Sequence, residues 1–293
     1  MTRREKDPGR PRADVSLIVI RVVLCLWGII ILYPFYNAVL LSITPRAVYI
    51  RNPFMLFPKG FTLSTFRNIF ENHEVHVGFV TTFKLLLFGL PLNMLLTTTM
   101  GYALAQDSFP GKRFFLVFVI VTMFFSGGII PLYLVNRALG LMNTLASVIL
   151  STAMNTFYMI LCKNYFESIP VSLSESAAID GANDLVIFGR IYLPLAKPIL
   201  ATIFLFYAVD RWNEWYLAML FLHRLNAIPL QLALRNIVSS AANKIGDIDT
   251  GRKIFPDGIK MAAVVVTMLP IMVLYPFLQK YFMKGIMLGA IKG

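Results

Sequence analysis

The sequence is poor in charged residues and in the side chains that build metal or redox sites. Charged residues make up 14% of the 293 positions, and there are only two cysteines and three histidines. Cys25 and Cys162 lie far apart, within or at the end of apolar segments, so no disulfide framework is predicted. No Ser/His/Asp or zinc-ligand constellation indicates catalysis. We therefore expect neither an enzyme nor a metal protein.

Three further absences argue against an ATPase, a cleaved signal peptide and a secondary transporter. The phosphate-binding pattern G-x-x-x-x-G-K-[ST] does not occur, so this chain does not supply an ATPase of that type. The first apolar run exceeds the 7–15 residues of a signal-peptide core and no A-x-A-like site follows it, which predicts a retained span. No internal repeat is visible, whereas secondary transporters often show inverted repeats.

Long apolar segments dominate what is present. The chain is 57% hydrophobic with a mean hydropathy of +0.70, which indicates an integral membrane protein. Continuous runs of roughly 20 residues, enough to cross about 30 Å of hydrocarbon, favour helices over barrel strands. An all-α polytopic fold is predicted, with six spans near 15–43, 77–105, 114–135, 142–162, 192–222 and 259–283.

The distribution of basic residues predicts the orientation. Five basic side chains precede the first span, so residues 1–14 are expected to form a cytoplasmic tail. With six spans, the C-terminus is cytoplasmic too. Residues 15–293 then form one membrane domain with outer loops at about 45–76 and 223–258, the second containing a short helix near 229–240.

A polar insert interrupts the apolar pattern at residues 172–190, on the predicted inner side. Ser172-x-x-Glu175 fits a capping box that would start a helix. Asp180-Gly181-Ala182 predicts a turn, in which glycine permits a backbone that a side chain would obstruct. Leu193-Pro194 ends the insert. A short structured hairpin between two spans typically contacts a soluble partner.

These residues resemble the EAA loop of ABC-importer permeases, with Ser176 in place of the first alanine. The similarity is carried by Glu175, Ala177, Asp180, Gly181, Ala182, Phe188, Ile191, Leu193 and Pro194. Residues 101–105, 109–113, 130–133 and 139–144 also match sugar-type permeases, and the tail at 279–287 is similar to the LplC/YtcP branch of the MalG-like group.

The resemblance implies a type I ABC permease fold in a bacterial inner membrane. It implies a second, homologous permease, two ATPase subunits that bind ATP and Mg, a periplasmic or lipid-anchored solute-binding protein, and an oligosaccharide substrate; no nucleic acid is expected. The ATPase-coupling residues would be Glu175, Ala177, Ala178, Asp180, Gly181, Ala182, Phe188 and Pro194. The alternative for Glu175 is a capping role alone.

The fifth span contains ionisable and aromatic side chains at membrane depth. Such residues usually face a polar cavity or one another. One interpretation is a substrate pathway that includes Arg211, Trp212, Asn213, Glu214, Trp215, Tyr216 and, from another segment, Tyr133. The alternative is an internal ion pair, since Arg211 and Glu214 are three residues apart and Asp210 and Glu214 are four apart.

The predicted outer segments, counted here as residues 45–76, 136–141 and 223–260, are unusually basic, with eleven basic side chains against five acidic ones. A positive rim favours an anionic ligand or an acidic partner. The LplC/YtcP branch that the chain resembles is associated with oligosaccharides, several of them uronate-containing. Compensation by lipid headgroups or by the partner subunit is the alternative. Two other functions compete with this one. The chain could be an ABC permease for a neutral sugar or another solute such as glycerol phosphate, or an ion-driven secondary transporter.

Overall fold

The computed structural model describes residues 15–52, 55–223, 227–243 and 257–273, and within these ranges the chain is helical without a strand. The predicted tail at 1–14 lies outside them. The helices are α1 (Val15–Ser42), α2 (Arg46–Arg51), α3 (Ser64–Phe70), α4 (His73–Lys84), α5 (Leu90–Ala105), α6 (Lys112–Phe124), α7 (Ile129–Ala138), α8 (Leu145–Ser151), α9 (Thr156–Glu167), α10 (Val171–Ile179), α11 (Asp184–Ile187), α12 (Leu193–Leu195), α13 (Lys197–Trp212), α14 (Tyr216–Phe221) and α15 (Leu230–Asn243), with π-helices η1 (Leu85–Gly89) and η2 (Phe188–Tyr192). Residues 257–273 are also helical. The all-α prediction is confirmed.

The described helices include two that are long and apolar enough to cross a membrane unbroken, Leu17–Ser42 and His73–Ala105. Three bent pairs could each form one more span: α6 with α7 at 112°, α8 with α9 at 50°, and Asp184–Leu195 with α13 at 82°. The predicted spans at 114–135, 142–162 and 192–222 are therefore not continuous helices. The helix at 257–273 begins the predicted sixth span, whose remainder lies outside the described residues.

Local sequence accounts for the breaks. Between α6 and α7 the chain is extended, and Gly128 has φ +84°, which a helix cannot contain. Between α8 and α9, the Asn155 side chain accepts hydrogen bonds from the N–H groups of Phe157 and Tyr158 and so starts a new helix. The third bend lies at Ala196, flanked by Pro194 and Pro198.

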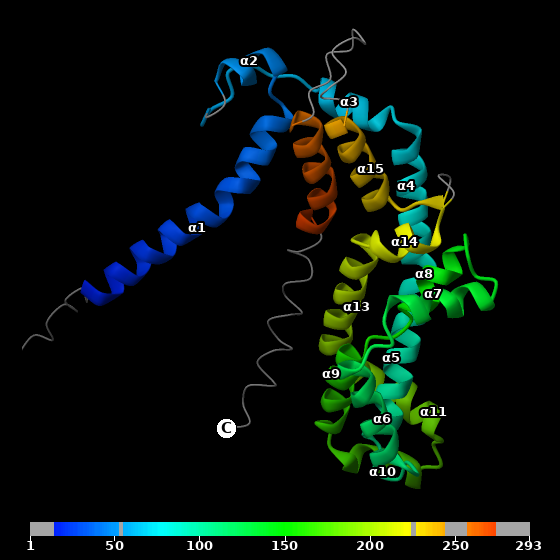
Figure 1. Ribbon diagram of the computed structural model, residues 1–293. Helices are drawn as coiled ribbons and strands as arrows, with labels where there is room; N and C mark the ends of the chain where they lie inside the picture. The colour runs from blue at the N-terminus through cyan, green and yellow to red at the C-terminus, as the bar shows by residue number, and fades with distance from the viewer. Residues whose placement is uncertain (1–14, 53–54, 224–226, 244–256, 274–293) are drawn as a thin grey trace, which may run out of the picture.

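Helix α1 stands apart from the other helices (Figure 1). Its apolar side chains point in all directions and most are exposed, including Leu24, Trp27 and Ile30. A helix that is apolar all round is expected in contact with lipid or with another subunit.

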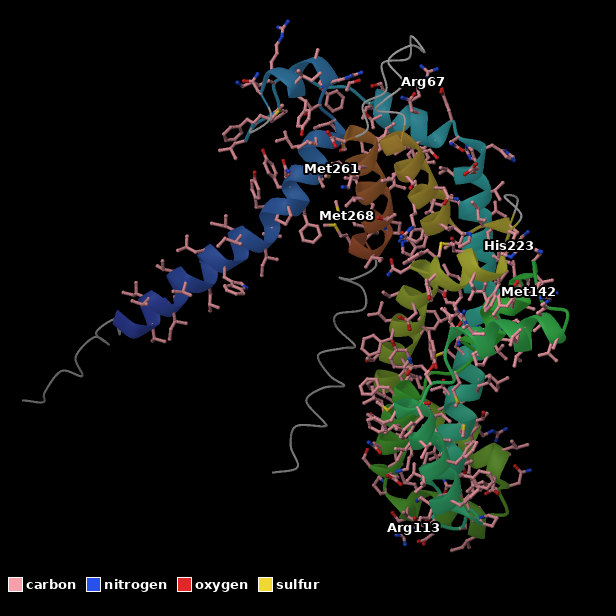
Figure 2. All side chains as sticks on the ribbon, in the orientation of Figure 1. Arg67, Arg113, Met142, His223, Met261 and Met268 are labelled. Carbon is pink, nitrogen blue, oxygen red and sulfur yellow. The ribbon has the colours of Figure 1, made fainter. Side chains whose placement is uncertain are left out.

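The helices from α3 onward form one body with two distinct ends (Figure 1). Helix α5 packs along α9, α4 packs along α15, and α13 packs against both α5 and α9. Arg67 and Arg113 mark opposite ends of this body (Figure 2). Helices α10 and α11 lie at the Arg113 end, which we call the hairpin end (Figure 1). Helix α15 matches the short helix predicted near 229–240.

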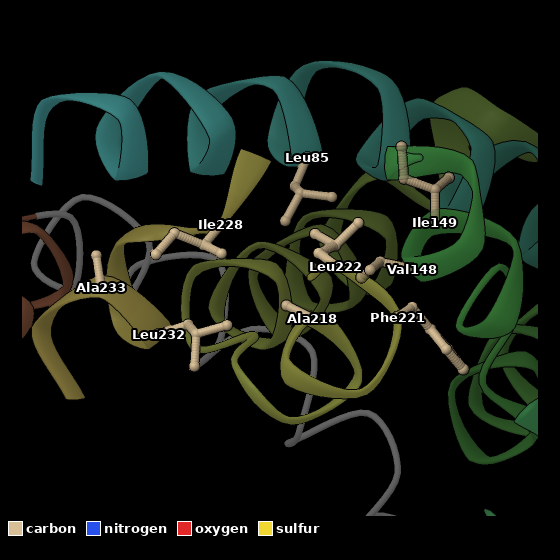
Figure 3. Close-up of a cluster of buried hydrophobic side chains, with 9 residues drawn as sticks. All are labelled: Leu85, Val148, Ile149, Ala218, Phe221, Leu222, Ile228, Leu232 and Ala233. Atoms are coloured by element: carbon tan, nitrogen blue, oxygen red, sulfur yellow. The ribbon is translucent and has the colours of Figure 1, made fainter. Parts of the chain in front are cut away.

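A buried cluster fixes the segment that follows α13. It joins η1, α8, α14 and α15 through the side chains shown in Figure 3, namely Leu85, Val148, Ile149, Ala218, Phe221, Leu222, Ile228, Leu232 and Ala233. A turn before α8 adds backbone support, because Asn143 N–H donates to Phe221 O at 2.9 Å and Asn143 Oδ1 accepts from His223 N–H at 2.8 Å. Asn143 has φ 59°, a conformation that asparagine tolerates. Residues 213–216 are thereby held between two packed helices.

Candidate functional site

The predicted polar insert folds as a hairpin of α10, a turn, α11 and η2. Its first helix begins at Val171, with Pro170 as N-cap and no side-chain cap. The predicted capping box at Ser172 and Glu175 is therefore wrong. Ser172 already lies inside the helix, whereas a capping residue must precede it. The Glu175 side chain is exposed and makes no hydrogen bond or ion pair with the described residues.

The turn after α10 is a Schellman motif. Ala182 N–H donates to Ala177 O at 2.9 Å, and Gly181 N–H donates to Ala178 O at 3.0 Å. Gly181 has φ +84°, as this motif requires. A Cβ at Gly181 would meet nothing within 4 Å, so the expectation of a turn too crowded for a side chain is wrong. The constraint is backbone conformation, and it places Ala177, Gly181 and Ala182 in one structural unit with exposed Asp180 and Ala178.

The second arm of the hairpin is anchored on the helix body by aromatic packing. Asn183, which sequence reasoning missed, accepts from Val186 N–H at 2.9 Å and starts α11. The Phe188 ring lies 4.9 Å from that of Tyr102 and 6.4 Å from that of Phe166. Pro194 is exposed and lies two residues after the end of η2, within α12; because proline has no N–H, the regular hydrogen-bond ladder is interrupted there.

The tip of the hairpin exposes apolar side chains. Ile179 is 87% exposed and Leu185 is 80% exposed, on either side of the turn. Sequence reasoning missed both residues, although two large aliphatic side chains beside a polar turn were the available signal. These two side chains form a small exposed apolar surface beside the polar residues of the turn.

Arg211 lies in the helix body, at the break between α8 and α9. It is 2% exposed, and its guanidinium donates to Val148 O, Ile149 O and Thr152 O at 3.4, 3.2 and 3.0 Å. It also donates to Thr152 Oγ1 and to Asn93 Oδ1. Asn93 donates in turn to Thr152 O and Ala153 O, each at 2.7 Å. The cation therefore satisfies the free carbonyls at the end of α8.

The structure does not contain the internal ion pair between Arg211 and the neighbouring carboxylates that was the alternative interpretation. Among the described residues, no salt bridge joins Arg211 to Asp210 or Glu214. Glu214 instead accepts a hydrogen bond from Leu217 N–H at 3.0 Å, at the start of α14. Asp210 accepts from the Tyr158 hydroxyl at 3.0 Å. Neither Asn93 nor Tyr158 was singled out from sequence, although a polar residue inside an apolar span was the signal for Asn93.

The aromatic residues of this region divide into packed and open ones. Trp212 donates from its indole to Thr267 O at 3.0 Å and packs beside Phe79. Tyr133 stacks on Phe221 with ring centroids 6.4 Å apart. Trp215 carries the Arg235 guanidinium 3.8 Å above its ring centroid.

The residues that remain open lie close together in sequence. Asp210, Asn213 and Tyr216 are exposed, and Asn213 also accepts from Gln231 at 3.3 Å. We group these three exposed residues with half-buried Tyr158 of α9, which donates to Asp210, and call the four residues the open polar face. Of the seven predicted pathway residues, Asn213 and Tyr216 belong to it, whereas Arg211 is engaged within the fold. Their role in transport stays a prediction.

Comparison with known proteins identifies relatives over nearly the whole chain. "Polygalacturonan/rhamnogalacturonan transport system permease protein YtcP" of Bacillus subtilis strain 168 is 38% identical over 273 residues, covering 92% of this chain and 96% of the relative. Protein LplC of the same organism is 38% identical over 268 residues, covering 91% of each. The predicted branch is confirmed.

A solved structure agrees in fold. A permease chain from the crystal structure of a bacterial ABC transporter involved in the import of the acidic polysaccharide alginate superposes with a TM-score of 0.83 and 32% identity, covering 94% of this chain and 100% of that one. The model of the family described as "Binding-protein-dependent transport system inner membrane component" matches residues 15–287. The chain therefore belongs to the family of inner-membrane components of binding-protein-dependent transport systems.

Proposed function

We propose that this chain is one permease subunit of an ATP-driven importer of acidic oligosaccharides. The hairpin carries this proposal. It is a rigid, Schellman-closed unit with exposed Ile179 and Leu185 at its tip, anchored on the helix body through Phe188. Such a unit suits docking into a groove of a cytoplasmic ATPase. The hairpin end would then face the cytoplasm, as would both termini.

The open polar face is the proposed substrate-facing surface of this subunit. An exposed carboxylate within a membrane-spanning region is costly against lipid, so Asp210 requires a polar surrounding. A water-filled cavity shared with a second, homologous permease supplies one. Asn213 and the Asp210 carboxylate would accept hydrogen bonds from sugar hydroxyls, and Tyr216 offers an aromatic face for a sugar ring.

The substrate class rests on two kinds of support. Two relatives are named for acidic polysaccharides or their transport, polygalacturonan in one and alginate in the other. Basic side chains add to this, since Arg46 and Arg51 of α2 and Lys59, which donates to Asn52, are exposed. Helix α2 lies toward the same end as α3, the helix of Arg67 (Figure 1). Several of the eleven basic residues lie outside the described ranges. With a Debye length of about 8 Å at physiological salt, these charges would capture and orient the substrate rather than supply most of the affinity.

In the proposed transport cycle, the ATPases, the permeases and the binding protein carry out different steps. ATP and Mg would bind two separate ATPase copies, and closure of the ATPase pair would draw the hairpins together and open the cavity outward. A solute-binding protein would deliver the oligosaccharide, and hydrolysis would restore the inward-facing state. ATP binding thus acts by favouring one of two conformations of the permease pair.

Reconstitution tests this proposal. The complex of both permeases, two ATPases and the binding protein is placed in proteoliposomes with galacturonate oligosaccharides or neutral glucose oligosaccharides of equal length. We expect ATPase stimulation and uptake with the acidic series only. Equal stimulation by neutral sugars would favour the neutral-sugar permease, and uptake driven by an ion gradient without ATPase would favour a secondary transporter.

A further inference from the structure

A bridge of four charged side chains joins the root of the hairpin to the turn between α5 and α6. Glu167 binds two lysines at once, with Oε2 2.7 Å from Lys163 Nζ and Oε1 3.2 Å from Lys112 Nζ. Lys112 Nζ also lies 2.8 Å from Asp107 Oδ1 and donates to Ala105 O at 3.3 Å. We call Asp107, Lys112, Lys163 and Glu167 the Glu167 bridge.

The burial of Lys163 makes Glu167, its carboxylate partner, the central member of this bridge. The Lys163 side chain is 9% exposed, and lysine is seldom buried without a partner. Removal of the Glu167 carboxylate would leave two ammonium groups near each other, and Lys163 would lose its carboxylate partner. A buried charge without a partner is strongly unfavourable. Asp107 is the most exposed member, at 94%; the Lys112 ammonium lowers its pKa, so it is a carboxylate at every physiological pH.

The central residue of the Glu167 bridge lies directly before the hairpin in sequence. Glu167 is the last residue of α9, and only 168–170 separate it from α10. Phe166 and Ile169, on either side, are buried in the same cluster as Ile187 and Tyr192 of the hairpin. The hairpin is thus fixed to the end of α9 by packing. The end of α9 is in turn fixed to the start of α6 and the end of α5 by charge.

We propose that Glu167 is a positioning residue for coupling, which makes the hairpin, α9 and the α5–α6 turn move as one unit. The inference rests on the proposed function. Without this carboxylate the hairpin tip, with Ile179 and Leu185, is unchanged and still docks on the ATPase. Its displacement then still reaches α9, and α5 through the packing of α5 on α9 and of Phe188 on Tyr102, but it is poorly transmitted to the α5–α6 turn and the start of α6, so nucleotide hydrolysis continues with less transport.

The test compares Glu167→Gln with a matched control in the full reconstituted complex. Glu71→Gln removes the carboxylate of another i,i+4 pair, Arg67–Glu71 at 2.6 Å, whose side chains are 78% and 59% exposed at the other end of the body. We expect Glu167→Gln to lower the ratio of oligosaccharide transported to ATP hydrolysed about tenfold, within the usual range of coupling between sites. Subunit stoichiometry and basal ATPase should stay normal, and Glu71→Gln should leave the ratio within about twofold of wild type.

A second variant separates coupling from folding. Lys163→Met combined with Glu167→Gln removes the buried unpaired ammonium but does not restore the link to Lys112. We expect this double variant to assemble normally and to remain poorly coupled. A wild-type ratio in either variant, or failure of both to assemble, would overturn the proposal. Absence of transport by the wild-type complex would instead contradict the proposed function itself.

Discussion

Two nitrogens of Arg211, Nε and Nη2, donate to the same oxygen of Asn93, at 3.1 and 3.0 Å, although the residues lie 118 positions apart. The pair joins α13 to α5 at the point where the span formed by α8 and α9 is broken. Three main-chain carbonyls of 148–152 accept from the same guanidinium. Because a membrane offers no water to replace these donors, this buried pair stabilises an interruption that would otherwise be costly.

Arg211→Lys should destabilise the assembled complex. A lysine ammonium has three donors and no planar fork, so it cannot satisfy Asn93 and the carbonyls of the α8 end together. We expect a loss of about 3 kcal/mol, measured as reduced thermal stability of the purified complex. Arg235→Lys is the control, because Arg235 is exposed above Trp215 and its loss should cost at most about 1 kcal/mol. Equal melting temperatures for the two variants would contradict the assigned role of Arg211.

Gly89→Ala should destabilise the contact between Arg211 and Asn93, because Gly89 lies against the Arg211 guanidinium. A Cβ at Gly89 would lie 2.9 Å from Arg211 Nε and 3.2 Å from Cζ, and the guanidinium cannot move away without losing its hydrogen bonds. Overpacking of this kind costs about 1–3 kcal/mol. Gly28→Ala, at a helical position where a Cβ meets nothing within 4 Å, should be neutral or stabilising in the same melting experiment. A neutral Gly89→Ala would mean that Arg211 is free to shift.

Features that depend on neighbouring residues could be predicted from the sequence, whereas contacts between distant segments could not. The hairpin and its Asp180-Gly181-Ala182 turn were predictable, because a Schellman turn depends on neighbouring residues. The start of α10 was mispredicted, because Pro170 begins the helix before Ser172. The partners of Arg211 could not be predicted, since they come from two segments, Asn93 of α5 and residues 148–152, that are both far from Arg211 in sequence. The breaks within the predicted spans were missed for a related reason, because hydropathy measures apolar length and not whether buried side chains satisfy an interrupted backbone.

The turn of the hairpin gives a prediction about coupling. Gly181→Asp places a side chain at φ +84°, which costs a non-glycine residue roughly 1–2 kcal/mol, and adds a charge to the docking surface. We expect weak ATPase association or ATPase activity that no longer responds to the binding protein. Gly181→Asn should retain most of the response, because asparagine tolerates this conformation and is uncharged. Full stimulated activity in Gly181→Asp would show that the turn does not meet the ATPase.

The apolar tip should provide much of the affinity for the ATPase. Burying one aliphatic side chain at an interface contributes roughly 1.5–3 kcal/mol, so Ile179→Ser or Leu185→Ser should weaken ATPase association about tenfold or more. The measurement is titration of the detergent-purified permease pair with ATPase. Leu56→Ser is the control, since Leu56 is 58% exposed but lies in another part of the chain, outside the hairpin. Unchanged affinity in both tip variants would place the docking surface elsewhere.

The two tryptophans of the fifth-span region should behave differently when truncated. Trp212 packs in the cluster with Val75 and Leu230 and donates to Thr267 O, so Trp212→Ala opens a cavity and removes the indole hydrogen bond to that carbonyl. Such losses cost about 3–5 kcal/mol, and assembly of the complex should fall.

Trp215 lies beside exposed Tyr216 and beneath exposed Arg235, so Trp215→Ala removes an aromatic surface next to the open polar face with less loss of packing. We expect normal assembly and reduced uptake of acidic oligosaccharide, because Arg235 would lose the ring that positions it. Uptake and subunit stoichiometry are measured on the same proteoliposomes, and Trp215→Phe should recover part of the uptake by restoring a ring. If Trp215→Ala assembles normally and transports at the wild-type rate, the substrate path does not pass this face; if it fails to assemble, Trp215 serves packing as Trp212 does.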